Sequence, residues 1–82
     1  MHTWSISSAD DRYHYLKVDG QYVDDAYVKR LCDQYGRSFG IYEISATRNV
    51  NCLMYCASGT YKSLKSAKTG CIRAAKQIGL ID

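Results

Sequence analysis

The sequence predicts an α+β domain in which an antiparallel or mixed sheet of about five strands carries two helices on one face. A hairpin signal at Asp19-Gly20 predicts paired strands near the N-terminus. Two segments with the 3.6-residue periodicity of amphipathic helices, and other segments typical of strands, give the order β-ββ-α-ββ-α. The 82 residues are expected to form a single domain, residues 1–82, because a second domain would be too small to bury its own core.

The first strand is expected at residues 3–7, and the hairpin that follows it at residues 12–23. A type I′ turn at Asp19-Gly20 requires positive φ angles, which Gly adopts readily and Asp tolerates. Because side chains alternate along a strand, this register separates a core face from an outer tyrosine stripe. The core face holds His14, Leu16, Val18 and Val23, and the outer stripe holds Tyr13, Tyr15, Lys17 and Tyr22.

A short helix is predicted next, from Asp24-Asp25 to Gly36. Carboxylates are favoured at the positive end of the helix dipole, and glycine is common just after a helix ends. The apolar face of this helix would hold Tyr27, Val28, Leu31, Cys32 and Tyr35.

Residues 38–46 and 50–57 are predicted as a second strand pair around Thr47-Arg48-Asn49. The second strand is apolar on both sides, which is typical of a central strand. On a strand, Cys52 and Cys56 lie about 13 Å apart, too far to bind one metal ion or to form a disulfide. We therefore expect Cys52, Cys56 and Cys71 to be buried, reduced and free of metal.

The last helix is predicted within residues 58–80, wound from about Tyr61, with Ser58 or Thr60 as its cap and Gly79 at its end. Its core face would contain Leu64, Ala67, Cys71, Ala74, Ala75 and Ile78. The opposite face would carry Lys62, Lys65, Lys68, Arg73 and Lys76.

The net charge of +3 is unevenly distributed along the chain. Residues 1–41 contain five Lys or Arg and six Asp, whereas residues 42–82 contain six Lys or Arg and two acids. The basic helix is consistent either with a solvated surface or with an anionic partner.

The segment SLKSAK at residues 63–68 resembles the lysine-rich start of the final helix in double-stranded-RNA-binding domains. The resemblance implies that these lysines contact phosphates across a groove. Leu64 stands where that family usually has lysine, and the chain has no proline, so the shared feature is the charge pattern.

The eight tyrosines are the other prominent feature, and three of them fall on the outer stripe of the first hairpin. Cross-strand aromatic pairs stabilise sheets, so the stripe has a structural interpretation. Exposed tyrosine is also enriched at protein interfaces and in base-stacking platforms.

No phosphate-binding glycine loop, catalytic carboxylate pair or nucleophile elbow is recognisable, which favours a protein that is not an enzyme and needs no cofactor. The sequence predicts a small non-catalytic protein that docks on and modulates or inhibits another macromolecule. Its small size and character are typical of phage or mobile-element proteins that act on host machinery. The expected partner is a protein or a nucleoprotein, bound by a monomer or a homodimer.

The alternative is a nucleic-acid-binding module that uses the basic helix and Arg48. No signal peptide or membrane-spanning run is apparent, so we expect a cytoplasmic protein without a membrane partner. The candidate contact residues for both hypotheses are Lys62, Lys65, Lys68, Arg73, Lys76, Tyr13, Tyr15, Tyr22 and Arg48.

Overall fold

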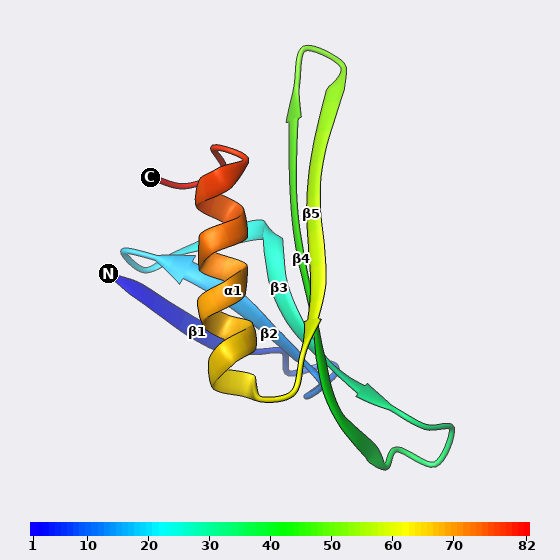
Figure 1. The fold of residues 1–82 in the computed structure, drawn as a ribbon. Coiled ribbons are helices and arrows are strands. Elements are labelled where there is room, and N and C mark those ends of the chain that lie inside the picture. Colours follow the sequence, from blue (N-terminus) through cyan, green and yellow to red (C-terminus); the bar gives the residue numbers. More distant parts are fainter.

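The computed structural model describes residues 1–82, except for the side chain of Asp24. The elements, in chain order, are β1 His2–Ile6, β2 Tyr13–Val18, β3 Gln21–Cys32, β4 Ser38–Val50, β5 Leu53–Tyr61 and α1 Leu64–Gln77. The strands form one antiparallel sheet in the order β1-β2-β3-β4-β5. The helix α1 packs against β3, β4 and β5 on one face (Figure 1). The α+β class is confirmed, but only one of the two predicted helices is present: the C-terminal helix forms, and the helix predicted at residues 24–36 does not.

The β2–β3 hairpin turns at Asp19-Gly20, as predicted. Asp19 and Gly20 have φ angles of 51° and 83°, the positive values that a type I′ turn requires. Lys17 pairs with Tyr22, but the register then shifts, so that Tyr15 pairs with Tyr27. Residues 23–26 of β3 therefore lie opposite Leu16 as a bulge, in place of the single residue Val23 that the sequence predicted there.

The predicted helix at residues 24–36 is instead the continuation of β3. Ala26 and Val28 are buried, while Tyr27 and Lys29 are half-buried on the other side, which is a period of two. The segment pairs with β2 on one side and β4 on the other, and this pairing overrides the helical periodicity. Gly36, which was predicted to end the helix, has a φ of 81° and lies in the turn before β4. The side chain of Asp24, predicted at the helix start, lies outside the described residues.

The β4–β5 turn lies at Asn51-Cys52 rather than at residues 47–49, and both turn residues have positive φ angles. Strand β5 is an edge strand, so the prediction of a central strand is wrong. Leu53 and Met54 are 60% and 66% exposed. Cys52 in the turn and Cys56 on β5 are also exposed, so the prediction that they are buried is wrong, whereas Cys71 is buried. The outer half of this hairpin extends beyond α1, which leaves its apolar side chains uncovered (Figure 1).

The helix lies close to the sheet because its buried side is made of small residues. Its N-cap is Ser63, whose Oγ accepts a hydrogen bond from the Ser66 amide at 3.1 Å, rather than Ser58 or Thr60. Gly70 faces Tyr61, and a Cβ atom at this position would collide with the tyrosine hydroxyl. The core cluster consists of Leu16, Ala26, Val28, Ile44, Ala46, Ala67, Cys71, Ala74 and Ala75, with Leu64 and Ile78 packed at its edge.

Candidate functional site

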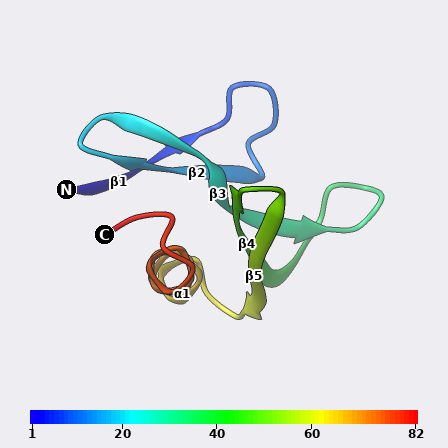
Figure 2. The ribbon, with the colours of Figure 1, turned by 90° about the horizontal axis from the view of Figure 1, so that it is seen from above.

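The face of the sheet opposite α1 is not covered by any element of the described chain (Figure 2). We call it the open face. Cross-strand partners share a face, so the register places Ser5, Tyr15, Tyr27 and Ser45 in one row across the sheet. The next row holds Tyr13, Lys29, Glu43 and Thr60, and Lys17 and Tyr22 lie toward the β2–β3 turn.

Tyr13, Tyr15 and Tyr27 form a tyrosine cluster on the open face. The rings of Tyr13 and Tyr15 are stacked with centroids 6.1 Å apart. Tyr27 meets them edge to face, at 5.5 Å from Tyr13 and 6.0 Å from Tyr15. These are favourable aromatic geometries, so the three rings hold one another in place while remaining accessible to solvent.

Two lysines lie over tyrosine rings of the open face, one at the cluster and one at Tyr22. The Nζ atom of Lys29 lies 5.4 Å from the Tyr13 ring centroid, and that of Lys17 lies 4.9 Å from the Tyr22 ring centroid. Both are within cation–π range. The open face is therefore aromatic at this end of the sheet, with Lys17 and Lys29 beside the rings and Glu43 across from Lys29.

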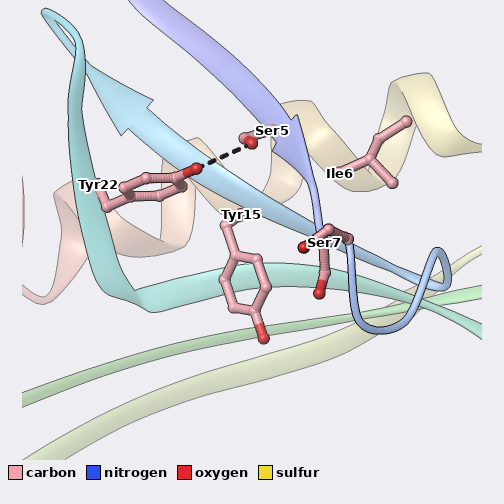
Figure 3. Close-up of a pocket in the computed structure, with 6 residues that line it drawn as sticks. Ser5, Ile6, Ser7, Tyr15 and Tyr22 are labelled. Atoms are coloured by element: carbon pink, nitrogen blue, oxygen red, sulfur yellow. Dashed lines mark hydrogen bonds between the residues drawn. The ribbon is translucent and has the colours of Figure 1, made fainter.

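A pocket of about 520 Å³ lies beside the cluster at β1 (Figure 3). The Tyr22 hydroxyl and the Ser5 hydroxyl are 3.1 Å apart, and either group can donate the hydrogen bond. The hydroxyl groups around the pocket can donate to or accept from a polar side chain without carrying charge. Its lining residues are Ser5, Ile6, Ser7, Ser8, Tyr15 and Tyr22.

The sequence predicted Tyr13, Tyr15 and Tyr22 as contact residues, and the structure places all three on the open face. Tyr27 was assigned to a helix and was missed, although its alternation with Ala26 and Val28 was a usable signal. The serines of the pocket were also missed, because a short Ser-rich loop has no distinctive pattern.

The predicted basic helix residues do not form one uniform surface. Lys62, Lys65, Arg73 and Lys76 are exposed, whereas Lys68 is half-buried with its Nζ 5.6 Å from the Trp4 ring centroid. Arg48 donates a hydrogen bond from Nη1 to the Ile78 carbonyl oxygen at 3.1 Å. Lys68 and Arg48 therefore also have structural roles, which tie α1 to β1 and to β4.

The buried titratable groups lie under the helix, on the face opposite the tyrosine cluster. Burial, followed by the positive charges of Lys68 and Arg30, lowers the pKa of His14, whose Nδ1 has no hydrogen-bond partner in the described chain. Burial raises the pKa of Cys71 to about 11, and its thiol lies 3.6 Å from the Tyr27 carbonyl oxygen. A thiol with this pKa is a poor nucleophile. The described side chains form no group of three or more His, Cys, Asp or Glu residues arranged to hold a metal.

No family model, curated protein or solved structure matches this chain. The predicted association with phage or mobile-element proteins therefore stays a prediction. Among the described residues, no helix has both the length and the hydropathy needed to cross a bilayer.

Proposed function

We propose that this chain is a non-catalytic binding protein that docks on another macromolecule, a protein or a nucleoprotein, through the open face of its sheet. The observation that carries the proposal is the cluster of Tyr13, Tyr15 and Tyr27, which lies in mutual contact on a face without cover in the described chain. Tyrosine contributes a large contact area at low entropic cost and is enriched among residues that dominate binding energy.

The charge and shape of the surface support a partner with acidic groups. Lys17 and Lys29 lie next to the tyrosine rings, where they can pair with carboxylates or phosphates at the rim of an interface. The serine-lined pocket provides a place for a projecting polar side chain. The molecule measures 40 × 25 × 22 Å, so its broad side is comparable to the roughly 800 Å² that each partner contributes to a stable interface. Docking would thus modulate or inhibit the partner by covering a functional patch.

Site-specific photocrosslinking in the native host tests this proposal. A benzophenone amino acid replaces Tyr15 or Tyr22 on the open face, and Tyr35 serves as the matched control. Tyr35 is 74% exposed and lies in the β3–β4 turn, away from the tyrosine cluster. We expect one partner to be crosslinked from positions 15 and 22 and not from position 35. Crosslinks confined to position 35, or none from the open face, would contradict the proposal.

A second candidate function, nucleic-acid binding, is favoured by the charge pattern of the C-terminal half. Residues 44–81 contain six Lys or Arg and no acid, and the exposed members lie on or next to α1. Titration with duplex and single-stranded DNA and RNA at two salt concentrations tests it, since phosphate contacts make affinity fall steeply with salt. Salt-sensitive binding that is lost in a Lys62→Glu/Lys76→Glu variant would favour this function, and no binding at low salt would exclude it.

A further inference from the structure

The outer edge of β5 is an unprotected sheet edge. Its sequence, LMYCASGTY, has no charged residue and no proline, although edge strands usually carry such residues to prevent pairing with other chains. Half of the backbone amide and carbonyl groups of an edge strand point away from the sheet. On β5 these groups form no hydrogen bond to another part of the described chain. The opposite edge, β1, is only 5 residues long.

A positively charged cleft of about 570 Å³ lies beside this edge, between the end of β5 and one side of α1. The helix runs back alongside β5 in both views (Figures 1 and 2). No acid lines the cleft, because Glu43, the cross-strand partner of Thr60, lies on the open face, and Lys68 lies elsewhere, against Trp4. The residues that line the cleft are Tyr61, Lys65, Ser66, Thr69, Gly70 and Arg73.

We infer that the edge of β5 binds an extended acidic segment of a partner protein by strand addition, with its acidic side chains in the cleft between β5 and α1. In this mode the backbone hydrogen bonds provide affinity, and alternate side chains provide specificity. The inference concerns a surface separate from the tyrosine cluster and does not depend on the function proposed for the open face.

The positions of the two cations predict the spacing of the acids. Lys65 and Arg73 are eight residues apart on α1, which corresponds to about 12 Å along a helix axis. An extended chain covers that distance in roughly four residues, at about 3.3 Å per residue. Residues four apart point to the same side of a strand, so acids at positions i and i+4 reach both cations.

Charge argues against a second copy as the occupant. Antiparallel pairing of two β5 strands would place two basic helices along one seam, and neither β5 nor α1 contains an acid to neutralise them. An acidic segment, in contrast, neutralises Lys65 and Arg73 on binding.

The test uses two peptides of identical composition and the full chain labelled with ¹⁵N. The probe is acetyl-Thr-Glu-Thr-Val-Thr-Glu-Thr-amide, with glutamates four residues apart. The control is acetyl-Thr-Glu-Val-Thr-Glu-Thr-Thr-amide, whose glutamates fall on opposite sides of a strand. We expect the probe to shift the amide resonances of Leu53–Tyr61 and to bind about tenfold more tightly than the control.

Matched double variants separate the cleft from general charge effects. Lys65→Glu/Arg73→Glu removes the cations of the cleft, and we expect it to weaken probe binding about tenfold or more. Lys17→Glu/Lys29→Glu makes the same charge change on the open face, and we expect it to leave probe binding within about twofold.

Four outcomes would overturn the inference. The first is the absence of β5 shifts at millimolar probe, and the second is equal binding of the two peptides. The third is that β5 resonances change with protein concentration alone, which would assign the edge to a second copy. The fourth is that single-stranded thymidine oligonucleotides, and not the probe, shift the residues of the cleft, which would assign it to phosphates.

Discussion

The two faces of this sheet are built from side chains of different size. Beneath α1, much of the contact is made by alanines of the strands and of the helix, Ala26, Ala46, Ala67, Ala74 and Ala75. On the open face, the neighbouring positions of strands β2 and β3 carry the rings of Tyr13, Tyr15 and Tyr27. Small residues let the helix approach closely, and the fully buried core lies on this covered face. The open face keeps a large aromatic area partly in water, which makes it available for a partner.

Cysteine labelling gives the largest contrast between the covered core and the exposed parts of the chain. Cys71 is buried beneath the helix, whereas Cys56 on β5 is exposed. Labelling of Cys71 requires an opening that costs close to the global stability, about 5 kcal/mol or more in a small domain. We expect Cys56 to react at least about a thousandfold faster than Cys71, as followed by peptide mass spectrometry. Similar rates for the two thiols in native protein would contradict the assigned core.

Leu16→Ala tests the covered face, and its neighbour Tyr15 provides the matched control on the open face. Leu16 is fully buried, and removing a buried leucine side chain typically costs about 2–5 kcal/mol. Tyr15 is half-buried and takes part in two ring contacts, so Tyr15→Ala should cost about 1–2 kcal/mol. Urea denaturation of both variants measures the difference. A larger loss of unfolding free energy for Tyr15→Ala than for Leu16→Ala would contradict the assignment of Leu16 to the core and of Tyr15 to the open face.

His14 makes the stability of the covered face depend on pH. Its pKa is lowered from 6.5 in the folded protein, first by burial and then by Lys68 and Arg30. Below pH 6.5 the unfolded chain therefore binds more protons at this site than the folded protein, and stability falls as the pH decreases. We expect the free energy of unfolding to decrease between pH 7 and pH 5 in the wild type, and to decrease less in His14→Gln.

Asp10 acts in a different pH window, so its contribution to stability is separate from that of His14. The Arg12 guanidinium and amide hydrogen bonds lower the pKa of Asp10 to about 2, so its contribution is lost only below about pH 4. An equal loss of stability in wild type and His14→Gln between pH 7 and pH 5 would exclude His14 as the cause.

Local sequence signals predicted the elements that depend on few distant contacts. The Asp19-Gly20 turn and the core face of α1 follow from the chemistry of a few neighbouring residues, and both are confirmed. The stripe of Tyr13, Tyr15 and Tyr22 follows from strand alternation and is also found on one face. These features required only the correct periodicity and the correct turn residues.

The incorrect predictions depended on pairing that the sequence does not display. Residues 26–32 fit both a helical and a strand periodicity, and pairing with β2 and β4 decided between them. Cys52 has a φ angle of 67°, which is unusual for cysteine, so the Asn51-Cys52 turn had no strong signal. The exposure of β5 depends on where α1 ends along the sheet, and no local pattern specifies that.

The smallest expected difference in stability is between alanine variants of two lysines on α1, Lys68 and Lys76. Lys68 lies against the Trp4 ring and is half-buried, whereas Lys76 is exposed. Lys68→Ala should cost about 0.5–1 kcal/mol through the lost cation–π contact, and Lys76→Ala should change stability by less than about 0.5 kcal/mol. Thermal unfolding measures both, and equal changes would remove the structural role of Lys68.

Docking through the open face is tested most directly by the affinity of the crosslinked partner for two double variants of this protein. Tyr15→Ala/Tyr22→Ala removes aromatic rings from that face, and Lys62→Glu/Lys76→Glu reverses exposed charges on and next to α1, outside the cleft. We predict that the tyrosine variant, checked to be folded, binds about a hundredfold more weakly, because central tyrosines often contribute 1–2 kcal/mol or more each. The lysine variant should bind within about threefold of wild type, since exposed charges at a distance act mainly on the association rate. Unchanged affinity in the tyrosine variant, with a large loss in the lysine variant, would contradict docking through the open face.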